Sequence, residues 1–421
     1  MAQNATKIYA NAFYLVKGQS PGHGLSRAAS PCQTTGFSPC RPLTQGRGCT
    51  YPVRSGFSQA GHARGGPAAK LIPMMRRAHC AGILVAISLS AFAQTAVRKL
   101  PGPIVARPGE LIGGPYAVNV GTKTATVAWA MKKTGTDKVT FQDLLPGTTY
   151  SYDFRVNGRT IEGSFKTAPV GPVPFHFVVY GDTRSRHEVH QRVVDAIVKV
   201  SPDFVIHTGD LVASGGDTPL WTRFFSIEHE LLSRAAFFPA VGNHEHNSAQ
   251  YFMFLQASPY YSFDWGAAHF TVLDTDFGNI PDSQKFFREQ FQWLENDLAR
   301  SQQASLRFVI FHHPPYSAVK KRGINQETVQ FVPLFEKYKV QAVFSGHDHA
   351  YEHFYQSGVH YIVTGGGGAP LYDVNHPLPG ITQKLDKVEH FVDVRVEGGR
   401  ASIEALTLDG RRIDYVELKG S

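Results

Sequence analysis

Five short segments of the chain place a possible metal-ligating side chain directly after a short apolar run. Each run has the length of a buried strand, so each of these side chains is expected at the end of a strand. Carboxylate, amide and imidazole groups are the oxygen and nitrogen ligands typical of Mn, Fe, Zn or Mg sites. The pattern therefore predicts one metal site assembled from five separate loops. The segments are Gly181-Asp182, Gly209-Asp210, Gly242-Asn243-His244-Glu245, His312-His313-Pro314-Pro315 and Gly346-His347-Asp348-His349.

Each of these residues taken alone has a simpler explanation. Asp182 would serve as the cap of a following helix, and Asp210 would be a turn residue. Asn243 would hold a turn in the left-handed backbone conformation, and His347 or His349 would be an ordinary loop histidine. The metal-site hypothesis rests on the whole set, because all the segments follow predicted strands and all supply ligands of compatible chemistry.

Apolar runs of strand length alternate with helical stretches from about Pro174 onward. This order predicts an α/β domain over residues 174–421, with helices that cover the sheet. In open α/β sheets, functional side chains gather beyond the carboxyl ends of the strands, which is where every segment above falls. The predicted helices are residues 188–200 and 283–300, and the predicted strands are residues 204–207, 237–241, 270–273, 308–311, 340–344 and 361–364.

The sequence pattern predicts a small β domain over residues 103–168, ahead of the α/β domain. Residues 122–129 alternate like a strand, and Val156-Asn157-Gly158 is a hairpin signal. The segment 145–169, with Leu-Pro-Gly-Thr and a later Gly-Ser-Phe-Lys-Thr, resembles the end of a fibronectin type III sandwich. At roughly two-thirds of the ~100 residues usual for such a sandwich, the segment is short.

The charge of the chain is divided unevenly along its length. Ten of the 42 Lys and Arg lie in residues 1–93, which contain no Asp or Glu, so residues 94–421 hold 32 basic against 34 acidic side chains. The formal charge of +8 therefore gives no case for a nucleic-acid partner, and none is expected. All four Cys also precede residue 94, which excludes a disulfide framework or a thiolate ligand in the rest of the chain.

Residues 74–93 have the order of a secretory signal peptide: basic Met74-Met75-Arg76-Arg77, an apolar run, and Ala91-Phe92-Ala93. The run is short for a membrane span, so we expect export to the periplasm or outside the cell and no transmembrane segment in the mature chain. Residues 1–73 would then precede the signal. Their Gly, Ser, Pro and Arg content predicts that they are disordered, or are not translated because synthesis starts at Met74 or Met75.

The order of the five segments resembles that of the calcineurin-like metallophosphoesterases. Three longer strings resemble the purple acid phosphatase branch of that superfamily, and the small β domain ahead matches this branch too. The resemblance covers about residues 174–370 and implies a β-sheet sandwich flanked by helices. The strings are Tyr261-Ser262-Phe263-Asp264-Trp265-Gly266, Gln292-Trp293-Leu294-Glu295-Asn296-Asp297-Leu298 and Gly346-His347-Asp348-His349-Ala350-Tyr351-Glu352.

The resemblance implies a site for two divalent metal ions, with Mn, Fe, Zn and Mg all open. A hydroxide held between the ions would attack the phosphorus of a phosphate ester. His244 is not needed as a ligand and would act as a general acid or bind a phosphate oxygen. The implied ligands are Asp210 as the bridge, Asp182 and His349 for the first ion, and Asn243, His312 and His347 for the second.

The chain departs from the family pattern at two positions. The tyrosine whose phenolate colours purple acid phosphatases is replaced by Ala213, so the protein is expected to be colourless. The histidine that the wider superfamily has two residues after the first Asp is replaced by Arg184, which leaves fewer ligands for the first ion. Arg184 would instead clamp a phosphate oxygen or pair with a nearby acid. His187 or His190 would be a substitute ligand for the first ion only if the following helix did not place them away from the site.

His312 is assigned as the ligand because it directly ends its strand, and the neighbouring His313 is expected to reach the substrate. The resulting hypothesis is an exported phosphoesterase with a phosphate-ester substrate, with phosphomonoesters favoured. Two alternatives stay open: a phosphodiesterase that uses the same centre, and a catalytically silent protein that binds a surface.

Overall fold

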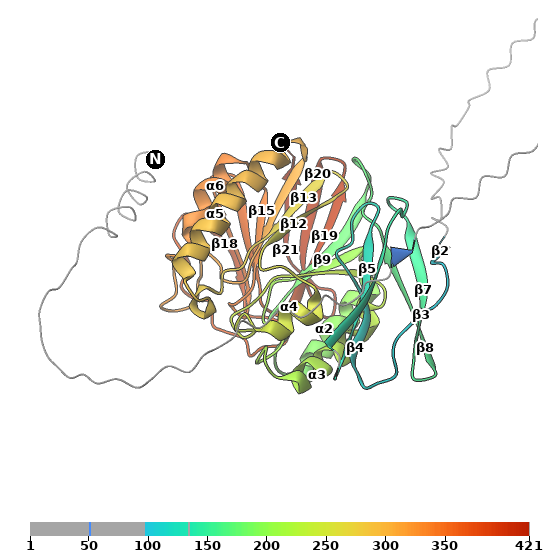
Figure 1. The fold of residues 1–421 in the computed structure, drawn as a ribbon. Helices are drawn as coiled ribbons and strands as arrows, with labels where there is room; N and C mark the ends of the chain where they lie inside the picture. The colour runs from blue at the N-terminus through green and yellow to red at the C-terminus, as the bar shows by residue number, and fades with distance from the viewer. Residues whose placement is uncertain (1–49, 52–96, 134, 421) are drawn as a thin grey trace, which may run out of the picture. The chain divides into compact units, whose positions relative to one another are not determined.

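The computed structural model describes residues 50–51, 97–133 and 135–420. The predicted signal peptide lies outside the described residues, as do all but Thr50 and Tyr51 of residues 1–73. These two residues form a short strand, β1, that pairs in parallel with β6 (Gly135–Phe141). The described residues all belong to one compact unit, shown in Figure 1.

Two large β-sheets form the centre of this unit. The first has ten strands, in the order β1-β6-β5-β4-β11-β10-β9-β19-β20-β21. Its central strands β9, β10 and β11 are parallel to one another. The bounds are β4 Leu111–Val118, β5 Ala125–Met131, β9 Phe175–Tyr180, β10 Phe204–His207, β11 Ala236–Pro239, β19 His390–Glu397, β20 Arg400–Thr407 and β21 Arg412–Lys419.

The second sheet has seven strands, in the order β12-β13-β14-β15-β17-β16-β18. Strands β13, β14 and β15 are parallel, so their carboxyl ends meet at one edge. The bounds are β12 Tyr261–Trp265, β13 Ala268–Val272, β14 Leu306–Ile310, β15 Ala342–Ser345, β16 Tyr351–Gln356, β17 Val359–Thr364 and β18 Thr382–Asp386.

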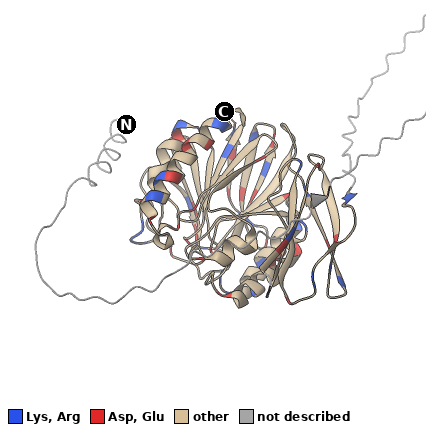
Figure 2. Ribbon diagram, viewed as in Figure 1, with Lys and Arg blue, Asp and Glu red and all other residues tan. Residues whose placement is uncertain are grey.

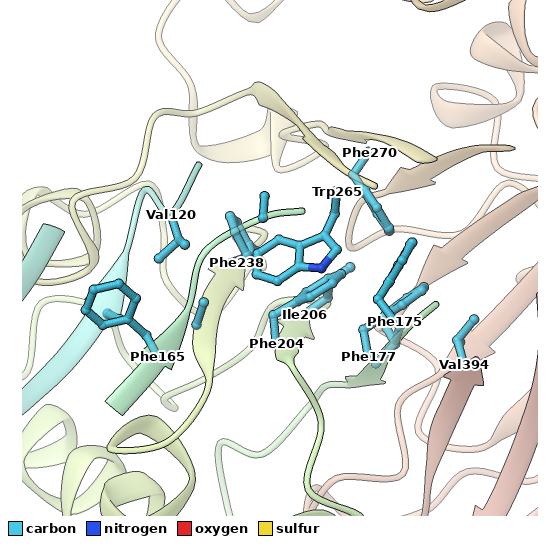
Figure 3. Close-up of a cluster of buried hydrophobic side chains, with 14 of the residues drawn as sticks. Val120, Phe165, Phe175, Phe177, Phe204, Ile206, Phe238, Trp265, Phe270 and Val394 are labelled. Carbon is cyan, nitrogen blue, oxygen red and sulfur yellow. The ribbon is translucent and has the colours of Figure 1, made fainter. Parts of the chain in front are cut away.

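Aromatic side chains fill the space between the two sheets. Phe177 of the first sheet meets Phe270, Phe308 and Phe344 of the second edge-on, with ring centroids 5.2, 5.7 and 6.4 Å away. Figure 3 shows Phe177, Phe204 and Phe270 converging with Trp265 in this core. Fully burying a Phe side chain contributes about 2 kcal/mol or more, so these contacts fix the distance between the sheets.

Helices cover the outer faces of both sheets. Buried Val193 and Ile197 of α2 pack with Val178 of the first sheet, and buried Leu294 of α5 packs with Val309 of the second. The expected sandwich flanked by helices is confirmed. The bounds are α2 His187–Val200, α3 Thr218–Leu232, α4 Ala249–Leu255, α5 Ser283–Arg300 and α6 Val332–Lys337, with short 3-10 turns at Phe277–Asn279, Ser301–Gln303 and Thr328–Phe331.

The segment predicted as a small β domain contributes to two sheets. Strands β4, β5 and β6 extend the ten-stranded sheet, because β4 pairs with β11 at Ala117 and Ala236. Strands β2 (Arg98–Lys99), β3 (Ile104–Val105), β7 (Thr149–Val156) and β8 (Arg159–Lys166) form a separate four-stranded sheet. Trp129 of β5 packs against Phe154 of β7, with ring centroids 5.0 Å apart, so the two sheets face each other. The division at residues 169–173 and the fibronectin type III-like interpretation stay predictions.

Charged side chains of both signs are interspersed along the visible helices and strands of Figure 2, in keeping with the charge count of residues 94–421. None of the described helices is long and apolar enough to cross a bilayer.

Candidate metal centre

The residues predicted to bind metal meet where the carboxyl ends of the parallel strands of both sheets come together. Asp182 follows β9, Asp210 follows β10 and Asn243 follows β11 in the first sheet. His312 follows β14, and His347 and His349 follow β15 in the second sheet. The site is therefore built from loops that two separate sheets hold in place.

The first cluster consists of Asp182, Asp210 and His349. All three are buried, and one ligand atom of each lies within 4.8 Å of the others. His349 Nε2 is 3.4 Å from Asp182 Oδ1, while His349 Nδ1–H donates to the carbonyl of Pro370 at 2.8 Å. Because that bond fixes the tautomer, the lone pair of Nε2 points at a carboxylate oxygen.

The second cluster consists of Asn243, His312 and His347. The Asn243 Oδ1 atom lies 3.0 Å from His312 Nε2 and 3.0 Å from His347 Nδ1. His312 Nδ1–H donates to the carbonyl of Thr208 at 2.9 Å, so its Nε2 also offers a lone pair to this space. His313 lies in the same group, because its ring nitrogens approach those of His312 and His347 within 4.8 Å.

Asp210 joins the two clusters. It belongs to the first cluster, and its Oδ1 lies 3.4 Å from His312 Nε2 of the second. The Asp210, Asn243 and His312 atoms that face one another are all acceptors, so a proton or a cation must lie between them. The donor set of carboxylate, amide and imidazole fits two divalent ions at these positions.

His347 and His313 are held in their neutral form. Burial lowers the pKa of His347 far below its usual value, and the nearby His312 and His313 lower it further. Burial and His312 likewise lower the pKa of His313 to about 3. Neutral imidazole is the form that binds metal, because its ring nitrogen keeps a lone pair.

Glu245 has a role that the sequence analysis did not assign, although it stands in a quoted segment. Its buried carboxylate accepts the backbone N–H groups of Asp210 and Gly242, both at 2.8 Å, and of Val212 at 3.1 Å. It thereby ties the loop of Asp210 to the loop that carries Asn243.

A second tie, also missed, connects the loops of Asp182 and Asp210. Gly209 N–H donates to His207 Nδ1 at 3.2 Å, so His207 Nε2–H donates to Thr183 Oγ1 at 3.1 Å. Thr183 Oγ1–H in turn donates to the carbonyl of Leu211 at 3.2 Å. His207 is fully buried in β10, and burial lowers its pKa well below the usual value.

His244 lies beside the bridging residue. Its Nε2 is 3.9 Å from Asp210 Oδ2, and its Nδ1 is 3.0 Å from the carbonyl of Ala213. Ala213 stands where the family tyrosine is missing, and here its carbonyl orients the His244 ring. The His244 Nε2 atom is left facing the metal centre.

Arg184 and His313, both expected to reach the substrate, contact residues of the site. Arg184 Nε lies 3.3 Å from Asp210 Oδ2, and the Arg184 side chain is 18% exposed. The Arg184 Nε atom itself is buried and makes no hydrogen bond to the described residues. His313 Nδ1 lies 3.2 Å from Thr275 Oγ1, and the ring stands 4.3 Å from that of His347.

The two substitute candidates, His187 and His190, lie away from the predicted ligand atoms. His187 begins α2, and His190 forms a buried pair with Glu228 at 2.7 Å, so the helix carries these residues elsewhere. The Asp182 side chain caps no helix, since the cap of α2 is Arg186. The segment 365–368 packs against the Asp182 loop, where a Cβ on Gly365 would meet Asp182 Oδ2 at 2.9 Å.

Comparisons with known proteins agree with this geometry. Residues 175–351 match the family model of the calcineurin-like phosphoesterases. The chain is 31% identical to the probable purple acid phosphatase 20 of Arabidopsis thaliana, over 53% of this chain and 58% of that protein. It is 26% identical to a purple acid phosphatase of Glycine max, over 57% of each chain.

The structure of a purple acid phosphatase from yellow lupin seeds superposes with a TM-score of 0.60 and 19% identity, covering 72% of this chain and 74% of the lupin chain. The chain spans a little over half the length of the Arabidopsis and Glycine relatives that it matches. Residues 175–351 therefore belong to the calcineurin-like phosphoesterase superfamily, and the chain is similar to the purple acid phosphatases of that superfamily.

Proposed function

We propose that the chain is a metal-dependent phosphoesterase with a dinuclear centre, and that it hydrolyses phosphomonoesters. The observation that carries the proposal is the position of Asp210, whose carboxylate contacts ligand residues of both clusters. A carboxylate shared in this way brings two ions close enough to act on one phosphate.

Asp182, Asp210 and His349 would hold the first ion, and Asn243, His312, His347 and Asp210 the second. When bound, the two ions would supply an activated water and stabilise negative charge on the phosphoryl oxygens. Glu245 and His207 contribute by fixing the loops, so that the ligands are arranged before any ion arrives.

His244 would donate a proton to the leaving group. Its Nδ1–H is engaged by the Ala213 carbonyl, so the proton that it can transfer is the one on Nε2, which faces the site. An alcohol leaves far more easily when it is protonated as the P–O bond breaks.

Arg184 would neutralise charge at the bridging residue and contact a phosphate oxygen. Its guanidinium is an always-charged group whose Nε lies 3.3 Å from Asp210 Oδ2, and its side chain is 18% exposed, so the group would also reach an anion in the site. His313 is neutral at ordinary pH and would contribute a hydrogen bond rather than a positive charge.

The preference for monoesters is supported by the relatives, which are named as purple acid phosphatases. Export is supported by the signal-like order of residues 74–93. The alternatives are a phosphodiesterase on the same centre and a silent surface-binding protein.

The proposal is tested on the full chain, stripped of metal and reloaded with Mn(II), by measuring hydrolysis of p-nitrophenyl phosphate and bis-p-nitrophenyl phosphate in parallel. We expect faster turnover of the monoester, and an Asp210→Ala variant should lose at least about a thousandfold in kcat/KM. Asp195→Ala, at an exposed position of α2, is the matched control and should keep full activity.

Faster diester turnover would establish the phosphodiesterase alternative instead. If the metal-loaded protein hydrolyses neither ester, the phosphoesterase proposal fails and the binding-protein alternative takes its place.

A further inference from the structure

A polar cleft of about 520 Å³ opens beside the first metal cluster. Two loops form it: one carries Val319 and Lys320, and the other carries Tyr372, Asp373 and His376. The loops are tied together by a hydrogen bond from the backbone N–H of His376 to the carbonyl of Ala318, at 3.0 Å. A volume of this size accommodates a small organic group in addition to a phosphate.

Tyr372 connects this cleft to the metal centre. Its ring stacks on that of His349, with centroids 4.1 Å apart and planes at 26°. Its backbone N–H donates to the His349 carbonyl at 2.9 Å. Tyr372 therefore lines the cleft and also contacts His349 of the first cluster.

Arg322 contacts both Tyr372 and the segment between His347 and His349. The Arg322 guanidinium lies 5.1 Å from the centroid of the Tyr372 ring. Arg322 also forms an ion pair with buried Asp348 and donates to the His347 carbonyl at 3.3 Å. These contacts fix the loop that carries Lys320 against the segment between the two ligands His347 and His349.

Lys320 and Asp373 are the charged side chains that line the cleft, and their formal charges sum to zero. Asp373 is paired with Lys387 at 2.8 Å, which offsets its negative charge. Lys320 is exposed, and within the described part of the chain it has no ion-pair partner. An ammonium group placed in this way attracts an anion and donates up to three hydrogen bonds to it.

We propose that this cleft binds a second anionic group of the phosphate-ester substrate, and that Lys320 determines this specificity. The inference rests on the proposed function of the metal centre. The preferred substrate is then a polar ester with a second phosphate or carboxylate on its organic part, rather than an ester with one anionic group.

The test compares glucose 1,6-bisphosphate with glucose 6-phosphate as substrates of the metal-loaded full chain. The ratio of their kcat/KM values is taken within each variant, so that a general loss of activity cancels. We expect the ratio to favour the bisphosphate in the parent chain and to fall by roughly fivefold in Lys320→Ala. The preference for the bisphosphate should also decrease at high salt, because Lys320 is exposed and salt screens its charge.

Lys321→Ala is the matched control, because Lys321 is an exposed neighbour that does not line the cleft. The ratio should be the same in this variant as in the parent chain. An unchanged ratio in Lys320→Ala, or an equal fall in Lys321→Ala, would overturn the proposal.

A binding measurement separates this inference from the proposed catalytic function. Calorimetry compares 1,3-propanediphosphonate with propylphosphonate, neither of which is hydrolysed. Tighter binding of the diphosphonate that Lys320→Ala abolishes supports the cleft, even if the chain turns over no ester. Equal binding of the two compounds by a chain that does hydrolyse p-nitrophenyl phosphate contradicts the cleft and leaves the catalytic proposal intact.

Discussion

Three of the expected ligands adopt backbone conformations that side chains ordinarily avoid. Asp182, Asp210 and His347 have φ angles of 60°, 58° and 68°. Each such residue costs on the order of 1 kcal/mol, and such residues cluster at functional sites where the surroundings enforce them. The enforcing contacts are visible here, since the His347 N–H donates to Asp182 Oδ2 at 3.0 Å and the Asp210 N–H donates to Glu245.

At the residue scale, the role assigned to His244 is open to a direct test. Replacing His244 with Gln should slow β-glycerophosphate, whose alkoxide is a poor leaving group, by about a hundredfold or more. The same change should slow p-nitrophenyl phosphate much less, since nitrophenolate leaves without a proton. The measurement is kcat on both esters.

His246→Gln is the control for this experiment, because His246 is an exposed histidine in the same loop. An equal loss on both esters in His244→Gln would show that His244 does not transfer a proton to the leaving group.

The candidate metal ligands were predictable from the sequence as polar residues that each follow an apolar strand, which is a local pattern. The residues that fix them were not, because their partners are distant in the chain. Glu245 accepts a hydrogen bond from the backbone N–H of Val212, and Thr183 contacts His207. The two residues of each pair lie far apart in the sequence, so helix or strand periodicity does not predict the contact. The contacts of Arg184 could not be predicted from the sequence either, because they depend on how the loops after β9 and β10 pack.

At the scale of elements, a buried histidine clamps two strands to a helix. His269 of β13 lies 2.7 Å from Asp264 of β12 and 2.9 Å from Asp297 of α5. Burial alone would lower the pKa of His269, but the hydrogen bonds to the two carboxylates outweigh it and raise the pKa to about 9. The clamp joins two of the strings that resemble purple acid phosphatases.

The clamp predicts a pH-dependent contribution to stability. Because the folded-state pKa is raised, the contribution is complete below the unfolded value of about 6.5 and disappears as the pH rises through about 9. With allowance for the exposed Asp264, we expect a loss of about 1–2 kcal/mol across this window. Urea unfolding of the parent chain and of His269→Gln between pH 6 and pH 10 measures it.

The His269→Gln variant should lack this part of the pH dependence. His229→Gln, at an exposed position of α3, should retain it. Parallel stability curves for the parent chain and His269→Gln over the whole pH range would show that the clamp does not contribute.

Helix α5 and strand β10 were predicted with their observed bounds, and α2 to within one residue, because their apolar spacing and length are unambiguous. Helix α3 and strands β19–β21 were not predicted. Strand β19 does show the alternating pattern, with Val392, Val394 and Val396 buried, but none of the predicted ligands follows strands β19–β21. Their place beside β9 follows from long-range pairing, which sequence spacing does not specify.

At the scale of the whole described unit, the first sheet runs through both predicted domains. The pairing of β4 with β11 rests on the single register pair Ala117 and Ala236, and no local signal marks it. The consequence is that the β-rich segment supports the sheet whose carboxyl ends carry Asp182, Asp210 and Asn243. The metal centre therefore depends on two large sheets meeting at one edge, rather than on any single motif.

The most direct test of the account is a titration of the metal-free full chain with Mn(II), with hydrolysis of p-nitrophenyl phosphate recorded at each addition. If Asp210 joins two metal positions, activity should rise until two equivalents per chain are bound, and the loaded protein should be colourless because Ala213 replaces the tyrosine. Saturation of activity at one equivalent, or two bound equivalents with no turnover, would contradict the dinuclear hydrolytic centre.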